Sequence, residues 1–234
     1  MIAVSIVGFK KTGKTTLAVA LGEELARRGI RAAAAKFTHH GETDVEGTDS
    51  HRLRKVYGKV AFLGSESSSV FWEGPRFLAD LLPILDADVL VVEGGKHLRW
   101  LPRVLLLRKL ADAGELEQGL ALASYGEVAG YDMPHVIDVA ALADLILERG
   151  FALPGLDCGS CGREDCASLA REIVAGKATL ADCRAARAEV EVSVAGQSVA
   201  MNSFVQQVFS GALRGMLKEF KGYAPGPIEI RIKG

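Results

Sequence analysis

The residues from 8 to 15 have the composition of a phosphate-binding loop. The pattern G-x-x-x-x-G-K-[ST] is met at every fixed position by Gly8-Phe9-Lys10-Lys11-Thr12-Gly13-Lys14-Thr15. In such a loop glycines let the backbone approach phosphate oxygens, the lysine ammonium contacts the β- and γ-phosphates, and the hydroxyl helps to hold Mg2+. The sequence therefore predicts a site for a nucleoside triphosphate and Mg2+, with the candidate binding residues Gly8, Lys11, Thr12, Gly13, Lys14, Thr15 and Thr16.

A second group of residues suited to chemistry is formed by the cysteines. All four lie in one segment with the spacing Cys158-x2-Cys161-x4-Cys166-x16-Cys183. A disulfide pair does not suit a reducing cytosol. Structural zinc suits four thiolates, but it usually has two short knuckles, and here the second pair is widely split. A compact loop with three cysteines and one distant fourth ligand favours an iron–sulfur cluster, with zinc as the alternative.

The elements next to the phosphate loop are those that the loop requires. A short apolar strand is predicted from Ile2 to Val7, and apolar residues recur at helical spacing from Leu17 to Leu25, before a stop at Gly29. The free N–H groups at the start of that helix, together with its dipole, favour an anion. Strand, loop and helix thus predict the same phosphate site.

The rest of the first 152 residues alternates between strands and helices, which predicts an α/β P-loop NTPase fold with a mostly parallel sheet. We expect strands at 31–37, 88–92, 103–107 and 119–124, a hairpin of 59–63 with 68–72, and helices at 75–85 and 138–149. The polar segment 38–51 is expected to be a long mobile loop on the nucleotide face. Leu153-Pro154-Gly155 marks a boundary.

The last residues predict a small α+β tail. A hairpin of 190–194 with 198–201, a helix at 204–220 and a final strand at 228–232 are expected. The capping-box pattern Ser203-x-x-Gln206 precedes the helix, and one helix face is almost wholly apolar, so we expect it to pack on a small sheet. The predicted domains are a nucleotide-binding domain at 1–152, a cysteine-rich module at 153–188 and the tail at 189–234.

Composition limits the classes of partner. The chain has 234 residues, 49% of them hydrophobic, with 28 basic against 29 acidic side chains. Near-zero net charge gives no electrostatic reason for general binding of nucleic acid or a membrane surface. The sequence shows no secretion signal and no apolar run long enough to cross a bilayer, so a cytoplasmic location is expected.

Four segments together resemble the MobB family, the molybdopterin-guanine dinucleotide biosynthesis proteins B, over roughly residues 1–150. They are the loop at 8–17, Lys36-Phe37-Thr38-His39-His40, Gly47-Thr48-Asp49-Ser50 and Val91-Val92-Glu93-Gly94-Gly95-Lys96. The resemblance implies a GTP-binding, weakly hydrolysing and usually dimeric protein that assists the attachment of GMP to molybdopterin. Separately, the cysteine spacing resembles the four-iron cluster domain of corrinoid iron–sulfur proteins and of the RnfB electron-transfer subunit.

The resemblance also implies roles for individual residues. Thr15 and Glu93 are expected at Mg2+, with Glu93 at the end of a buried strand, and Asp49 is expected to reach the metal through water. Asp49 and Glu93 are thus the candidate catalytic residues, while His39 and His40 have no assigned role. The usual guanine-reading segment is absent, because Lys109-Leu110-Ala111-Asp112 has the wrong gap and first residue. Preference for GTP over ATP therefore rests on the resemblance alone.

These features predict a GTP-binding accessory protein of molybdenum or tungsten cofactor synthesis that carries a 4Fe-4S cluster. Its expected partners are a molybdopterin nucleotidyltransferase or a molybdenum or tungsten enzyme, and a second copy of itself. Two alternatives stay open. One is a nucleotide-gated carrier that inserts a metallocluster into a client, and the other is an electron-transfer module with a regulatory nucleotide site. The metal-trafficking ATPases have an extra lysine in the loop where this chain has Phe9, which weakens the carrier alternative.

Overall fold

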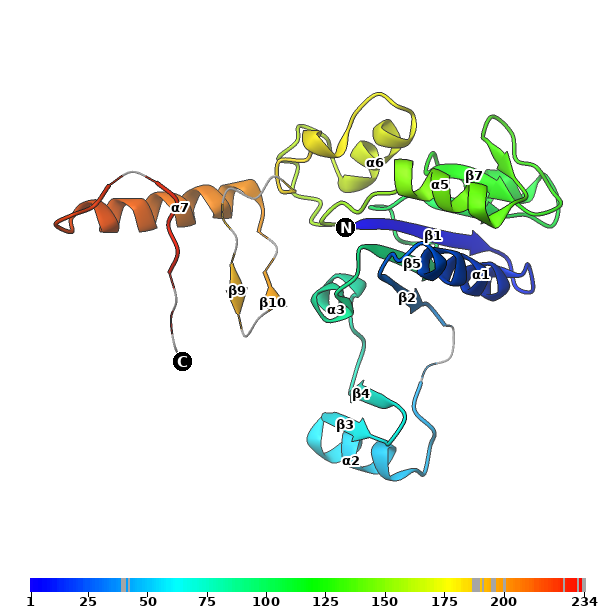
Figure 1. Ribbon diagram of the computed structural model, residues 1–234, viewed down its shortest axis with the longest axis horizontal. Helices are drawn as coiled ribbons and strands as arrows, with labels where there is room; N and C mark the ends of the chain where they lie inside the picture. Colours follow the sequence, from blue (N-terminus) through cyan, green and yellow to red (C-terminus); the bar gives the residue numbers. More distant parts are fainter. Residues whose placement is uncertain are drawn as a thin grey trace. The chain divides into compact units, whose positions relative to one another are not determined.

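The computed structural model divides the chain into two compact units, Met1–Ala152 and Leu153–Gly234 (Figure 1). It describes residues 1–38, 41, 43–186, 190, 192–194, 197–199, 201–224, 226–230 and 232. His39 and His40 lie outside the described residues. The expected boundary between residues 188 and 189 stays a prediction.

The first unit is built on a six-stranded sheet in which every pair of neighbouring strands is parallel. Its strands in spatial order are β2 (Ala32–Lys36), β5 (Val89–Glu93), β1 (Ile2–Gly8), β6 (Arg103–Leu106), β7 (Ala121–Tyr125) and β8 (His135–Val136). This arrangement confirms the predicted α/β class and its mostly parallel sheet. The carboxyl ends of β2, β5 and β1 meet at one edge, which is where parallel sheets of this class bind ligands.

Helices cover both faces of the sheet, and alternate residues of β1 point to opposite faces. Val4 and Ile6 pack with α1 (Lys14–Arg27) and α5 (Val139–Arg149) in one apolar cluster. Ala3 packs in another cluster with α3 (Leu78–Leu85), and Val7 packs with α4 (Asp112–Leu116). A strand buried on both faces reads as a continuous apolar run, which explains why the strand pattern was visible in the sequence.

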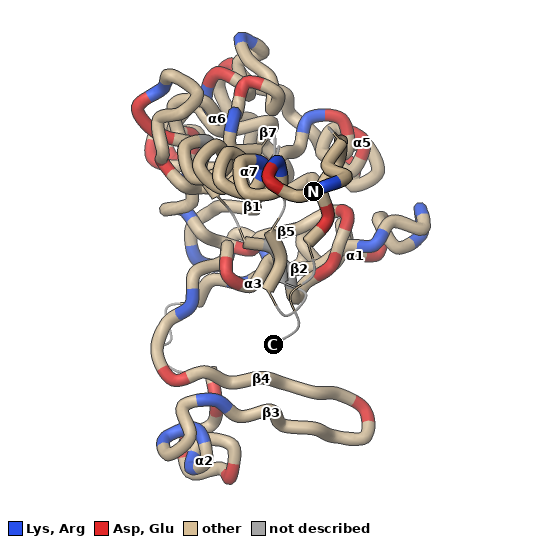
Figure 2. The backbone as a smooth tube through the Cα atoms, turned by 90° about the vertical axis from the view of Figure 1, so that its left-hand side faces the viewer, with Lys and Arg blue, Asp and Glu red and all other residues tan. Residues whose placement is uncertain are grey.

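Residues 49–72 form a helix and a hairpin that contact each other. Strands β3 (Lys59–Leu63) and β4 (Ser68–Trp72) are antiparallel and have the predicted bounds. Helix α2 (Asp49–Tyr57) was not predicted, because the segment 38–51 was expected to be a loop throughout. Helix α3 begins at Leu78, three residues after the predicted start. Figure 2 shows that the hairpin is mostly uncharged, and that positive and negative residues are interspersed along the described chain.

The second unit contains α6 (Cys166–Val174), a 3-10 turn (Leu180–Asp182), the short strands β9 (Ser193–Val194) and β10 (Gln197–Ser198), and α7 (Ser203–Lys218). Helix α6 was not predicted, since only the segment up to Cys166 was assigned, as a loop with three cysteines. The expected last strand is wrong, because residues 228–230 and 232 lie in no strand. Among the described residues, no helix is long and apolar enough to cross a membrane.

Two expectations for α7 are also wrong. The capping residue is Asn202, one position before the predicted Ser203, and its side chain accepts a hydrogen bond from the backbone N–H of Val205 (3.0 Å). Gln206 instead donates to the backbone carbonyl of Met201 (2.9 Å). The apolar face is not covered by a sheet, since its apolar side chains are largely exposed, among them Phe204, Val208, Phe209, Met216 and Phe220.

Candidate functional site

The phosphate loop makes a tight turn between β1 and α1. A Cβ on Gly8 would lie 2.5 Å from Thr12 Oγ1 and 2.7 Å from the carbonyl oxygen of Leu106, so a side chain at position 8 has no room. Gly13 has a φ of 85°, which other residues adopt only at a cost, and it immediately precedes the first residue of the helix. The two glycines of the sequence pattern are therefore required for different reasons: Gly8 because a side chain would clash, and Gly13 because of its positive φ.

The Lys14 side chain folds back over the loop. Its Nζ donates to the carbonyl oxygen of Phe9 at 2.6 Å, and Thr12 Oγ1 donates to the same oxygen at 3.0 Å. Burial lowers the pKa of the Lys14 ammonium, the negative charge of Glu93 opposes this change, and the nearby positive charges of Lys96 and Lys36 add to it. An anion that met the loop would offer this partly desolvated ammonium a stronger partner than a neutral carbonyl.

Thr15 and Glu93, the two residues expected at Mg2+, contact each other directly in the structure, while their metal role stays a prediction. Thr15 Oγ1 donates to Glu93 Oε1 at 2.9 Å. Glu93 is the last residue of β5, and its side chain is only 13% exposed. A hydroxyl and a carboxylate are oxygen donors of the kind that Mg2+ prefers, so this pair fits a Mg2+ ion that accompanies a triphosphate.

A third residue, Lys36, completes this group and was missed by sequence reasoning about the site. It ends β2 directly opposite Glu93 in the parallel register. Its Nζ lies 3.0 Å from Glu93 Oε2 and 3.3 Å from Thr15 Oγ1. Two signals in the sequence pointed toward it, its place near the end of the predicted strand 31–37 and its position as the first residue of the MobB-like segment that begins at Lys36.

Two further cations surround the side chain of Phe9. Lys96 Nζ lies 4.0 Å from the centre of the Phe9 ring, and Arg108 Cζ lies 4.7 Å from it. Lys96 also forms an ion pair with Glu115 at 3.5 Å. Cations over an aromatic face are weakly attracted, so the ring fixes positive charge beside the phosphate loop.

The loop that carries Lys96 is held by Arg103, the other residue that sequence reasoning missed. The Arg103 side chain is fully buried and donates to the carbonyl oxygens of Leu116 (2.8 Å), Leu98 (3.0 Å) and Lys96. Burial, with a smaller contribution from Arg99, lowers its pKa to about 10. The guanidinium therefore stays charged at neutral pH and ties the segment after Glu93 to α4.

Asp49 is not in contact with Thr15 or Glu93 in this structure. Its side chain is 88% exposed and lies 3.9 Å from Arg52 on the same helix. The neighbouring residues have local roles, since the Thr48 side chain accepts from the N–H of His51 and Ser50 Oγ donates to Asp44 Oδ1 (2.9 Å). The Gly47–Ser50 segment thus starts α2, and the catalytic role of Asp49 stays a prediction.

Asp112 belongs to the segment Lys109-Leu110-Ala111-Asp112, and its side chain is held by contacts with the nearby Arg108. It is 4% exposed, and its Oδ2 accepts a hydrogen bond from the backbone N–H of Arg108 (3.1 Å). The Arg108 side chain lies 3.5 Å from the same oxygen. These contacts give Asp112 a structural role at the start of α4.

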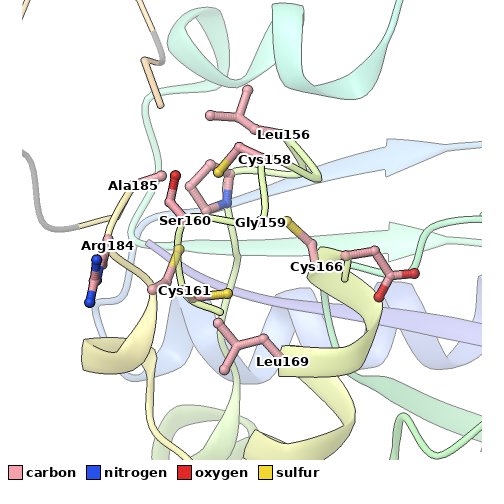
Figure 3. A pocket seen from close by; sticks show the side chains of 12 residues that line it. Leu156, Cys158, Gly159, Ser160, Cys161, Cys166, Leu169, Arg184 and Ala185 are labelled. Atoms are coloured by element: carbon pink, nitrogen blue, oxygen red, sulfur yellow. The ribbon is translucent and has the colours of Figure 1, made fainter. Parts of the chain in front are cut away.

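In the second unit, all four cysteines line one pocket (Figure 3). They are free thiols, three of them partly buried and Cys183 buried. Glycines at positions 159 and 162 have φ values of 65° and 80°, which bend the backbone around the pocket. Asp157 Oδ1 accepts from the backbone N–H of Cys166 (2.8 Å), and this hydrogen bond joins the loop to the first residue of α6.

The donor set of this pocket fits a soft metal or an iron–sulfur cluster, although the thiols would have to turn to bind one. Within the described residues, no three histidine, cysteine, aspartate or glutamate side chains are already arranged to hold a metal ion. Burial raises the pKa of the Cys166 thiol to about 11 and also raises that of Cys183. These thiols are therefore protonated at neutral pH, and they must lose their protons to solvent when they bind a metal.

Comparison with known proteins identifies both segments. Residues 3–125 match the family MobB, "Molybdopterin guanine dinucleotide synthesis protein B", and residues 153–185 match a family described as "Putative Fe-S cluster". The chain is 27% identical over 99% of its length to a Methanocaldococcus jannaschii protein, 97% of which is covered, named "Putative molybdopterin-guanine dinucleotide biosynthesis adapter protein". It is 32% identical to the Escherichia coli molybdopterin-guanine dinucleotide biosynthesis adapter protein, with 58% of this chain and 86% of that protein covered.

A solved structure agrees at the level of the fold. The crystal structure of Bacillus subtilis MobB matches with a TM-score of 0.53 and 24% identity, over 64% of this chain and 99% of that one. The family model covers more than half of the present chain, and its bounds lie inside the first compact unit. The chain therefore belongs to the MobB family, the molybdopterin guanine dinucleotide synthesis proteins B, and carries a second segment that matches an iron–sulfur cluster family.

Proposed function

We propose that this protein is a GTP-binding adapter with weak GTPase activity in the synthesis of molybdopterin guanine dinucleotide. The observation that carries the proposal is the contact of Thr15 Oγ1 with Glu93 Oε1 (2.9 Å) beside Lys14, at the end of the phosphate loop. It supports a site for a triphosphate with Mg2+. The choice of guanine is supported by the names of the relatives, since no contact among the described residues of the first unit argues for one base.

Lys14, Thr15 and Glu93 have separate roles in this proposal. The Lys14 ammonium leaves the Phe9 carbonyl for the phosphate chain, and the helix N-terminus supplies further N–H donors. Thr15 and Glu93 hold Mg2+, which neutralises charge on the phosphates when bound. Glu93 also accepts a hydrogen bond from Lys36, so its carboxylate is better suited to hold a cation than to take a proton from water. Hydrolysis is therefore slow.

The second part of the proposal is a 4Fe-4S cluster at Cys158, Cys161, Cys166 and Cys183. It is supported by the convergence of all four thiols on one pocket and by the match of this segment to a family described as "Putative Fe-S cluster". The cluster would supply either an electron-transfer centre or a structural crosslink between the four cysteines of this segment. The partner is a molybdopterin nucleotidyltransferase or a molybdenum or tungsten enzyme, and the protein acts as a homodimer.

Nucleotide binding is tested with the full-length protein by isothermal titration with GTP and ATP in Mg2+ buffer. We expect GTP to bind more tightly than ATP. Lys14→Ala should weaken GTP binding by about 10- to 100-fold, because it removes a charge-assisted contact with phosphate. The matched control is Lys59→Ala, an exposed lysine in β3. Equal GTP affinity in wild type and Lys14→Ala, or a preference for ATP, would contradict the proposal.

The cluster is tested by anaerobic purification followed by iron, sulfide and zinc analysis of one sample. Iron and sulfide in equal amounts are expected, and they should fall together in Cys166→Ser. Ser160→Ala, a change of another residue that lines the pocket, should leave both unchanged. Zinc without sulfide would contradict the cluster and favour a structural zinc site.

A further inference from the structure

The contact geometry of Lys36 differs from that of an ordinary surface ion pair. Its ammonium touches both Glu93 Oε2 (3.0 Å) and Thr15 Oγ1 (3.3 Å), while Thr15 Oγ1 donates to Glu93 Oε1. These three groups form a closed triangle. Its two oxygen-bearing corners are the residues to which the proposed function assigns Mg2+.

The position of the Lys36 backbone is fixed by the sheet, but its side chain is largely exposed to solvent. Lys36 lies opposite Glu93 in the β2–β5 register, so its Cα cannot leave the site without breaking strand pairing. Its side chain is 58% exposed, whereas that of Glu93 is 13% exposed. The Glu93 carboxylate is therefore largely covered, and the ammonium that neutralises it is attached to a fixed backbone position while its side chain has solvent beside it into which it can turn.

A divalent ion and this ammonium cannot both contact the same two side chains at close range, because the two positive charges repel each other. Lys96 and Lys14 already place positive charge nearby, since the charges of Lys96 and Lys36 both help to lower the pKa of the Lys14 ammonium. Mg2+ that takes Thr15 and Glu93 must therefore displace Lys36. A triphosphate that arrives with Mg2+ provides new acceptors within reach of the released ammonium.

We propose that Lys36 is a tethered monovalent cation that takes the place of Mg2+ at Thr15 and Glu93 and is exchanged for Mg2+ when the nucleotide binds. The inference rests on the proposed function, since it needs Thr15 and Glu93 to be metal ligands. Its consequence is order in binding: Lys36 makes the site a poor one for a free divalent ion and a good one for a metal–nucleotide complex. The site is thereby protected against occupation by divalent metal alone.

The test uses Mn2+ as a paramagnetic probe of the full-length protein without added nucleotide. Free Mn2+ is measured by electron paramagnetic resonance during titration of wild type, Lys36→Gln, Lys36→Arg and Lys59→Gln. Removal of the competing cation should tighten Mn2+ binding by Lys36→Gln about two- to fivefold, the range of a partly exposed ion pair. Lys36→Arg keeps the positive charge and Lys59→Gln lies outside the site, so both should match wild type.

The result that overturns the inference is Mn2+ affinity in Lys36→Gln equal to or weaker than that of wild type, with thermal unfolding showing that the variant is folded. A parallel titration of wild type with GTP in the presence of Mn2+ distinguishes failure of the cation exchange from failure of the proposed function. If GTP binds but Lys36→Gln does not tighten Mn2+ binding, the exchange of cations is wrong and the proposed function stands. If wild type binds no GTP, the proposed function itself fails.

Discussion

Replacing Arg103 by methionine should destabilise the first unit by about 3 kcal/mol. The guanidinium donates to three backbone carbonyls, and each of them loses a buried charged donor at a cost of about 2 kcal/mol. The opposing effect is the removal of a buried charge. A pKa near 10, against an ordinary value above 12, corresponds to about 3 kcal/mol against the charged form. The loss of three such donors costs about 6 kcal/mol in total, and removal of the buried charge returns about 3 kcal/mol of it. The net loss in the free energy of unfolding is therefore about 3 kcal/mol.

The assay is urea unfolding followed by the fluorescence of Trp100, which packs on the apolar cluster around Leu90. Trp72 is the second tryptophan and is replaced by phenylalanine in all variants. With a denaturant slope of about 2 kcal/mol per molar, the midpoint of Arg103→Met should fall by roughly 1.5 M.

The matched control is Arg99→Met, because Arg99 is exposed and repels the charge of Arg103. This variant should unfold at the wild-type midpoint. Arg103→Lys should fall between the two, since one ammonium keeps the charge but cannot reach three carbonyls at once. A midpoint for Arg103→Met that equals that of Arg99→Met would refute the idea that the carbonyl contacts outweigh the cost of burying the charge.

Two further predictions concern a helix cap and an ion pair. Asn202→Ala should lower the free energy of unfolding of the second unit by about 1 kcal/mol, whereas Ser203→Ala keeps the capping acceptor and should not; circular dichroism during urea titration compares them, and equal losses would speak against the cap. Hydrogen bonds from two neighbouring arginines lower the pKa of Glu24 to about 2, from an ordinary 4.5, so its stabilising effect is complete above about pH 5 and disappears as the pH falls toward 2. Glu24→Gln should therefore lower the Tm at pH 7 and flatten its decline in acid, and superimposable Tm profiles would contradict this.

The parts of the fold that could be predicted are those whose signals are local. The first strand and the hairpin around Gly64 have apolar runs bounded by turn residues; the hairpin strands have the predicted bounds, and β1 extends one residue beyond its predicted end, to Gly8. Helix α2 was missed because it is polar and lacks an apolar stripe. Its start and stop were nevertheless visible, since Thr48 caps it and Gly58 ends it in the left-handed conformation.

The parts of the site that could not be predicted depend on contacts between distant residues. Lys36 meets Glu93 only because β2 pairs with β5 in one register, which the sequence does not specify. Arg103 looked like the polar first residue of an apolar strand, and its burial depends on carbonyls from two other segments. The apolar face of α7 was also misjudged for this reason. An apolar stripe indicates that a helix can pack against another element, but it does not specify which element, if any, contacts it.

The position of β1 in the sheet has a consequence for synthesis of the protein. Its neighbours on both sides come much later in the chain, because Ile2 pairs with Val89 in β5 and Ser5 pairs with Arg103 in β6. At about 5 to 20 residues per second, a ribosome needs on the order of ten seconds to make those partners. During that time both edges of an apolar strand stay open on the nascent chain. The yield of folded protein should therefore depend on the speed of translation and on chaperones that shield the first residues.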